Sequence, residues 1–271
     1  MLFARKSSNA TELIMECLKY YEANDIYLNQ NNEYLKLRDG LLNSNRIDLN
    51  SFKHFVYATR ETQFTDFLIG VAHSGSIDTK EQNHFQYRLV NEYLYISLTY
   101  FTKKSVDQAI EIMSLYKDRP YLILDLRNSP GGYVDACMSF CRMLIDDKKE
   151  IVTLSYKNKK TTYYTDDHAL ISYKKIYIFV NEHTASCSEI SALALKINLQ
   201  FVRLIGNQTK GKKCGQEIIV NKSSGFSMII PAFTWKCNEY GIEDLQQLLY
   251  YDCDADRRFV TDEDYYSMVF T

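Results

Sequence analysis

The stretch Tyr121-Leu-Ile-Leu-Asp-Leu-Arg-Asn-Ser-Pro-Gly-Gly132 carries the pattern from which the fold is predicted. Its first six residues are largely apolar, follow a proline and precede a glycine pair. A strand buried on both faces of a parallel sheet has this character. The glycines permit a tight turn. After the turn, apolar residues from Val134 to Leu144 recur at the spacing of one helix face. The stretch therefore predicts a strand, a turn and a helix in succession.

The same order of elements returns further along the chain. An apolar run at Ile176–Val180 is followed by a turn of small residues. Apolar residues from Ile190 to Ile197 then mark one helix face, and another strand is expected at Phe201–Ile205. Two strand–turn–helix units predict an α/β fold with a layered core and a mostly parallel sheet. The reactive edge of such a sheet lies where its strands end.

Residues 9–60 read as helical and polar, so we expect a small N-terminal helical subdomain over residues 1–63. The α/β core is then expected over residues 64–271. A capping box at Ser105-Val-Asp-Gln108 predicts the start of a helix. The remaining expected elements are strands at Phe67–Ala72 and Tyr93–Tyr100, an antiparallel pair at Glu217–Val220 and Phe226–Ile230, and a short helix at Asp262–Met268.

Composition narrows the class of protein. The 271 residues are 46% hydrophobic and 24% charged, as in ordinary globular proteins, and the net charge is −2. A net charge of this size does not indicate the positive surface that nucleic-acid-binding proteins carry. No apolar run reaches the ~18 residues needed to cross a bilayer, and the first thirty residues do not read as a signal peptide. We therefore expect a cytoplasmic protein without membrane or nucleic-acid partners, or an exported one if a leader has been removed.

The seven cysteines include no CxxC pair, which argues against a zinc site. Cys137 and Cys141 lie four residues apart on an expected helix and are most simply read as small buried side chains. Reduced thiols agree with the cytoplasmic expectation. We expect neither a metal nor an organic cofactor.

Ser186 lies at the expected start of a helix, where free backbone N–H groups and the positive end of the helix dipole favour negative charge. A serine there can attack a carbonyl while the amide of Cys187 faces the resulting oxyanion. In the simpler interpretation, Thr184, Ser186 or Ser188 only caps the helix.

The turn that ends in Gly131 and Gly132 offers a second oxyanion donor, because glycine permits unusual φ values and close backbone approach. An ordinary turn with a glycine hinge is the alternative. Asp125 and Arg127 are placed to form an ion pair that fixes this turn, although a surface pair has the same spacing.

A serine nucleophile needs a base. His183 is too close in sequence to reach Ser186, and the other four histidines lack supporting context. Lys212 is the better candidate, since an amine becomes a base near neutral pH when burial or neighbouring positive charge lowers its pKa. Lys210 and Lys213 flank it, and Gln216 is placed to orient the amine. A solvated basic turn is the alternative interpretation.

Three segments together resemble the C-terminal-processing serine peptidases, also called tail-specific proteases. They are Leu124–Gly132, Asn181–Ile190 and Gly211–Gln216, which look like the DLRxNPGG, SASASEI and GKGxxQ segments of that family in the same order. The similarity covers residues 92–245. The resemblance implies a ClpP/crotonase-like layered core and a serine endopeptidase that forms an acyl-enzyme with peptide or protein substrates.

The resemblance also implies roles for individual residues. Ser186 matches the nucleophile, Lys212 the general base and Gln216 the residue that positions it. The Gly131/Gly132 turn and the amide of Cys187 match the oxyanion hole.

Three features depart from the family pattern. Lys213 replaces a glycine, Cys187 replaces an alanine, and Lys212 follows Ser186 by 26 residues, one more than the pattern leads us to expect. Only residues 67–91 are available where the family carries a PDZ domain, which is too short for one. We therefore expect a member without a PDZ domain.

Other readings of the chain carry less weight. The segment Gly206–Lys213 nearly satisfies a phosphate-binding loop, but it ends in lysine, which cannot bind Mg²⁺, and a strand is expected after it. Ser114 and Lys117 fit SxxK without a KTG partner, and GxSxG is absent. A cysteine peptidase built on Cys187 lacks a partner histidine. A binding protein on the same fold, without turnover, remains the alternative of a different class.

Overall fold

The computed structural model describes residues 10–44, 47–63, 65–69, 83–166, 169–221, 225–253 and 258–270. The chain forms two compact units. The first contains residues 1–81, 155–159 and 214–234, and the second contains residues 82–154, 160–213 and 235–271. The boundary expected after residue 63 stays a prediction.

Three helices fill the segment that was expected to be helical in the first unit: α1 (Ala10–Asn24), α2 (Asn32–Leu42) and α3 (Leu49–Thr59). Local side chains start two of them. Asn31 accepts a hydrogen bond from the backbone N–H of Tyr34, and Asp48 accepts one from Ser51. Each bond satisfies one of the donors left unpaired at a helix start.

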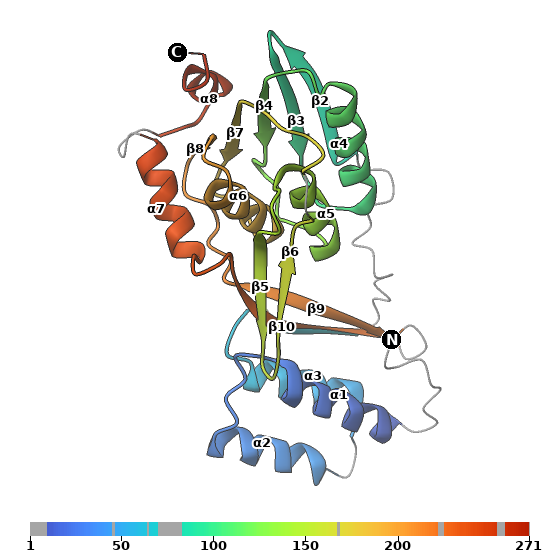
Figure 1. The fold of residues 1–271 in the computed structure, drawn as a ribbon. Coiled ribbons are helices and arrows are strands. Elements are labelled where there is room, and N and C mark those ends of the chain that lie inside the picture. Colours follow the sequence, from blue (N-terminus) through green and yellow to red (C-terminus); the bar gives the residue numbers. More distant parts are fainter. Residues whose placement is uncertain are drawn as a thin grey trace. The chain divides into compact units, whose positions relative to one another are not determined.

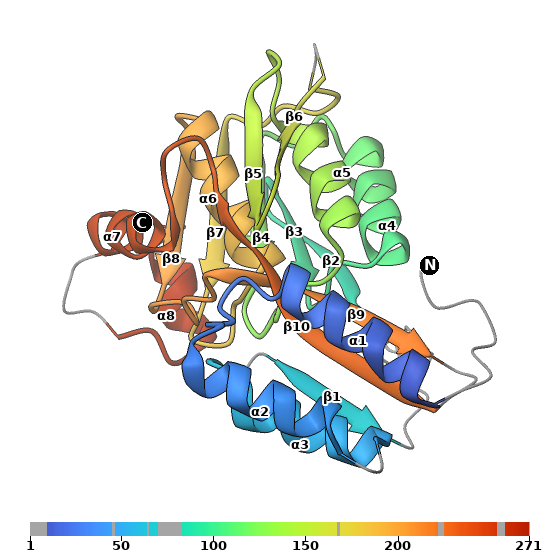
Figure 2. The same ribbon diagram turned by 90° about the horizontal axis from the view of Figure 1, so that it is seen from below.

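An antiparallel set of strands completes the first unit (Figure 2). β10 (Phe226–Lys236) pairs with β1 (Asp66–Ile69) and with β9 (Cys214–Asn221), so the predicted antiparallel pair near the end of the chain is confirmed. β1 ends earlier than the expected strand, and residues 70–72 of that prediction lie outside the described residues. Phe67 meets Phe52 edge to face and stacks on Phe226, and these rings join the helices to the strands in one buried core.

The second unit contains a five-stranded sheet in the order β2-β3-β4-β7-β8. A tight connection makes β2 and β3 antiparallel, whereas helical crossovers make β3, β4, β7 and β8 parallel. With the antiparallel strands of the first unit, the sheets are mixed, and one mostly parallel sheet does not describe the whole chain. The bounds are β2 (Phe85–Val90), β3 (Tyr93–Leu98), β4 (Tyr121–Asp125), β7 (Lys175–Val180) and β8 (Val202–Gly206).

The helices α4 (Lys103–Leu115), α5 (Val134–Leu144) and α6 (Cys187–Asn198) lie side by side against this sheet (Figure 1). The prediction for the start of α4 was wrong by one turn. Thr102 is its N-cap and Ser105 is the third helical residue, whose hydroxyl accepts a hydrogen bond from the Thr102 backbone. The capping box is thus real, but Ser105 is its second member.

Four further elements complete the chain. The strands β5 (Glu150–Tyr156) and β6 (Lys160–Tyr164) are sequence neighbours and adjacent in their sheet, and neither was expected. Helix α7 (Ile242–Asp252) was not expected either, whereas α8 (Asp262–Ser267) occupies the predicted final helix. No helix in the described ranges is long and apolar enough to span a membrane.

Candidate active site

The two predicted turns lie together because they leave neighbouring strands. β4 and β7 are parallel partners, so both end at the same edge of the sheet. Hydrogen bonds join the turns directly. The backbone N–H of Ala185 donates to the carbonyl of Ser129 at 2.9 Å, and the hydroxyl of Ser188 donates to the Ser129 hydroxyl at 2.8 Å. Both serine side chains are fully buried.

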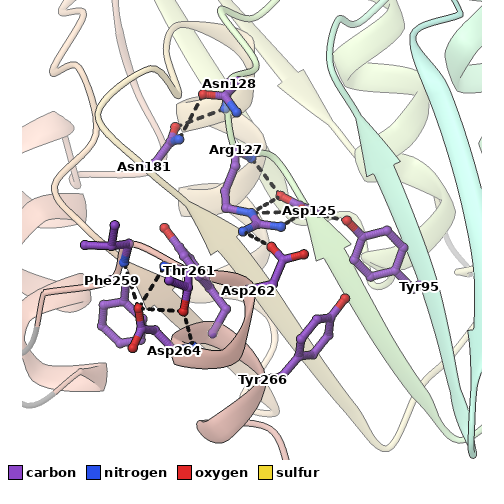
Figure 3. Close-up of polar contacts among 12 residues, drawn as sticks. Tyr95, Asp125, Arg127, Asn128, Asn181, Phe259, Thr261, Asp262, Asp264 and Tyr266 are labelled. Atoms are coloured by element: carbon purple, nitrogen blue, oxygen red, sulfur yellow. Dashed lines mark hydrogen bonds and ion pairs between the residues drawn. The ribbon is translucent and has the colours of Figure 1, made fainter.

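A second set of polar contacts holds the beginning of each turn (Figure 3). Asn128 and Asn181 exchange two hydrogen bonds of 3.0 Å, one through the Asn128 backbone N–H and one through its side-chain oxygen. Arg127 binds Asp125 through its Nε and Nη2 atoms and reaches Asp262 of α8 at 2.7 Å. The expected Asp125–Arg127 ion pair is therefore confirmed, and it is largely buried rather than a surface pair.

Ser186 has a backbone conformation that residues other than glycine rarely adopt. Its φ is 55° and its ψ is −122°, and it immediately precedes α6. A non-glycine residue with this φ is strained and persists only where its surroundings impose it. The residue is half-buried.

Gly131 and Gly132 fit tightly beside this serine. A Cβ atom on Gly131 would lie 2.8 Å from the Ser186 Cβ and 2.9 Å from the Cys187 backbone nitrogen. The φ values of the two glycines are 108° and 149°. Among the described residues, the N–H groups of Gly132 and Cys187 donate to no other group. Unpaired donors beside a serine are the elements of an oxyanion site.

Glu189 is the central polar group of the site, and it was missing from the sequence-based set of residues. Its buried carboxylate accepts from the Ser186 N–H at 2.7 Å and the Lys212 N–H at 3.1 Å. It also accepts from the Gly211 N–H at 2.7 Å and the Thr209 hydroxyl at 2.6 Å. Burial raises the pKa of this carboxyl, and the four hydrogen bonds oppose that rise. The spacing Ser186-x-x-Glu189 is that of a capping box and was the available signal.

The backbone of Lys212 is fixed from both sides. Glu189 accepts from its N–H, and the indole N–H of Trp235 donates to its carbonyl at 2.9 Å. Trp235, the single tryptophan of the chain, was not among the predicted site residues. Lys213 pairs with Glu243, and its suggested influence on the Lys212 amine stays a prediction. The backbone N–H of Lys210 donates to the carbonyl of Thr184 at 2.9 Å, which ties this segment to the serine turn.

Gln216 lies on β9 in the first unit, opposite Pro231 of β10. Its expected role beside Lys212 stays a prediction. The strand β9 follows Lys213 directly, where a phosphate-binding loop would require a helix. Ser114, the first residue of the SxxK match, donates its hydroxyl to the Ile110 carbonyl within α4.

All seven cysteines are buried, and none of them forms a disulfide. The Cys187 thiol lies 3.3 Å from the carbonyl of Gly132, and the Cys137 thiol lies 3.3 Å from the carbonyl of Cys187. Burial raises the pKa of the Cys137 thiol, so this thiol favours the uncharged form, which is a poor nucleophile. Among the described residues, no three His, Cys, Asp or Glu side chains are grouped to hold a metal ion.

Comparison with known proteins places these segments in a family. Residues 92–242 match peptidase family S41. The carboxy-terminal processing protease CtpA of Bacillus subtilis (strain 168) is 32% identical over 123 residues, which cover 45% of this chain and 26% of that protein. The carboxyl-terminal-processing protease of Synechocystis sp. is 26% identical over 142 residues, covering 51% of this chain and 33% of that protein. The chain thus spans at most a third of the length of these two relatives.

Solved structures show the same fold. A photosystem II D1 C-terminal processing protease matches with a TM-score of 0.67 at 15% identity, over 87% of this chain and 91% of that one. A lipoprotein from Streptococcus agalactiae also has a TM-score of 0.67, at 19% identity, over 89% and 90% of the two chains. Because the sequence match extends over more than half of its residues, the chain belongs to peptidase family S41.

Proposed function

We propose that this protein is a serine endopeptidase in which Ser186 is the nucleophile and Lys212 the general base, with Gln216 orienting the amine. The observation that carries the proposal is the Glu189 carboxylate, which holds the backbone nitrogens of Ser186 and Lys212 at 2.7 and 3.1 Å. A single buried group thereby fixes the two residues whose side chains must cooperate. The names of the relatives, which include C-terminal processing proteases, support the same substrate class of peptides and proteins.

The proposed reaction uses these groups in the following order. The neutral amine of Lys212 takes the proton of the Ser186 hydroxyl as the oxygen bonds to the scissile carbonyl carbon. The N–H groups of Gly131, Gly132 and Cys187 stabilise the oxyanion, and loss of one such donor costs about 10²–10³ in rate. The lysine returns the proton to the leaving amine as the C–N bond breaks. Water then hydrolyses the acyl-enzyme, and neither a metal nor an organic cofactor takes part.

The strained backbone of Ser186 is a further argument for catalysis over simple helix capping. At this helix start the Glu189 side chain accepts a hydrogen bond from the Ser186 N–H. A structural serine gains nothing from a positive φ, whereas strain imposed by surroundings is concentrated at functional sites. The ClpP/crotonase-like assignment of the core is part of the same proposal.

Two substitutions test the proposal. Ser186→Ala and Lys212→Ala should each abolish cleavage of a peptide library and of denatured protein, while circular dichroism shows an unchanged fold. Ser139→Ala and Lys210→Ala are matched controls, because Ser139 and Lys210 are exposed. Mass spectrometry after treatment with a fluorophosphonate should detect the adduct on Ser186. Full activity in either active-site variant rejects the assignment, and peptide binding without any turnover by the wild type supports the binding-protein alternative.

A further inference from the structure

We infer that Tyr100 and Tyr133 form one wall of the subsite for the side chain of the residue whose carbonyl is attacked, and that this wall selects a large apolar or aromatic side chain. The inference rests on the proposed function and adds a substrate preference to it. Both tyrosines belong to the second unit, as do Ser186 and the oxyanion donors.

The two rings form a pair at the rim of the glycine turn. Their centroids are 6.2 Å apart and their planes are nearly perpendicular, at 86°. Tyr133 follows Gly132 directly, starts α5 and is 45% exposed. Tyr100 precedes Phe101, whose backbone bonds both sides of the same turn: its N–H donates to the Gly131 carbonyl, and its carbonyl accepts from the Tyr133 N–H, both at 2.8 Å.

Tyr100 and Tyr133 are close in sequence and structure to the proposed oxyanion donors. This position determines which substrate residue the two rings would contact. Gly131 is in contact distance of Ser186 and Cys187, and the Cys187 thiol bonds the Gly132 carbonyl. A substrate carbonyl oxygen held by these amides lies within about 2.8 Å of the Cα of its own residue, from the lengths of the C=O and Cα–C bonds. The side chain on that Cα therefore leaves the backbone beside the residues that surround the donors.

The surroundings of Tyr100 are poor in water. Burial is the main cause that raises the pKa of its phenol to about 12, and the neighbouring Tyr133 and Cys187 add to the rise. His84 packs against the Tyr100 ring with centroids 5.5 Å apart, and its Nδ1 atom lies 3.2 Å from the Thr99 hydroxyl. The Nε2 atom of His84 is buried and has no hydrogen-bond partner among the described residues. An apolar side chain loses less hydration than a charged one when it packs against these rings.

Because Tyr133 is 45% exposed, an incoming apolar group can contact it. Aromatic pairs favour offset or edge-to-face contact and contribute beyond the area that they bury. Phenylalanine, tyrosine, leucine or methionine at the cleaved position would contact the exposed ring of Tyr133, whereas alanine or glycine would not reach it. The selected substrate therefore carries a bulky apolar residue on the acyl side of the scissile bond.

The test compares two peptides that differ only in having Phe or Ala at the cleaved position. The ratio of their kcat/KM values should favour Phe in the wild type and fall about 2- to 10-fold in Tyr133→Ala. Tyr133→Phe keeps the ring and should keep the ratio. Tyr164→Ala is the matched control, since Tyr164 is an exposed tyrosine on β6.

Binding to the Ser186→Ala protein separates this inference from the proposed function. Fluorescence anisotropy of the same peptides should show the Phe preference in Ser186→Ala and its loss in Ser186→Ala with Tyr133→Ala. Cleavage by the wild type with an unchanged ratio in Tyr133→Ala overturns the inference alone. A preference in binding that depends on Tyr133, without any cleavage by the wild type, overturns the proposed function alone.

Discussion

The Oε2 atom of Glu189 lies 2.7 Å from the backbone nitrogen of Ser186, inside the first turn of the helix that Ser186 begins. Through its two oxygens the same carboxylate also accepts hydrogen bonds from Thr209, Gly211 and Lys212. A fully buried acid with four donors is satisfied only while both segments keep their places. Glu189 is therefore a positioning residue, because it acts through the backbones of the residues proposed for catalysis.

Replacing this acid should separate positioning from folding. Glu189→Gln keeps the shape of the side chain but replaces one acceptor oxygen with an NH₂ group, which faces backbone N–H donors. Because small displacements of reacting groups cost about 10²-fold in rate, we expect kcat to fall by roughly that factor. Peptide cleavage kinetics measure the change. The exposed neighbour Glu182 provides the control variant Glu182→Gln, and wild-type kcat in Glu189→Gln would contradict the positioning role.

The raised pKa of Glu189 predicts how stability depends on pH. Between the ordinary value of 4.5 and the raised value, the folded protein binds more protons at this site than the unfolded chain does. The free energy of unfolding contributed by this group therefore decreases as pH rises through that window. Urea unfolding from about pH 4 upward should show wild type losing stability relative to Glu189→Gln as pH increases. A difference that is independent of pH, or of opposite slope, contradicts the prediction.

Gly131 is predicted to tolerate no side chain. In Gly131→Ala the new Cβ would lie 2.8 Å from the Ser186 Cβ, so the serine must shift, and we expect kcat/KM to fall by at least about 10²-fold. Gly211→Ala is the matched comparison, because its φ of 74° is also left-handed but nothing lies within 4 Å of the added Cβ. It should cost about 1–2 kcal/mol of stability with a smaller loss of activity. Equal losses of activity would show that φ strain alone matters.

Trp235 should stabilise the segment around Lys212, the proposed base, through one hydrogen bond. Trp235→Phe keeps an aromatic ring but removes the indole N–H that binds the Lys212 carbonyl. A buried acceptor left without its donor costs about 1–3 kcal/mol, measured by urea unfolding. Because Lys212 would then lose the contact that holds its carbonyl, kcat should fall while KM stays close to the wild-type value. A loss of stability with full kcat would limit Trp235 to a structural role.

The two acids that bind Arg127 should contribute unequally. The Asp262 side chain is 57% exposed and the Asp125 side chain is 5% exposed. Asp262→Asn should therefore cost less than about 1 kcal/mol, as exposed pairs do. Asp125→Asn leaves a buried guanidinium poorly paired and should cost about 3 kcal/mol or more. Urea unfolding at pH 7 measures both, and a larger cost for Asp262→Asn would contradict the ranking.

The sequence by itself determined the local elements near the site. Apolar runs and helical spacing identified β4, β7 and α6 because these patterns depend on residues only a few positions apart. The glycine pair and the small residues before α6 marked the two turns for the same reason. Ser186, Gly131 and Gly132 were therefore predictable as neighbours of strand ends, and the structure brings them together.

The tertiary structure decided what surrounds those residues. Glu189 contacts Lys212 across 23 positions of the chain, and Trp235 contacts it across another 23, so neither contact follows from local spacing. Lys213 pairs with Glu243, a partner that the local spacing does not reveal. Which partner a side chain finds depends on how strands pair and helices pack. Local propensity and hydrophobic periodicity carry no information about that choice, because both are set by near neighbours in sequence.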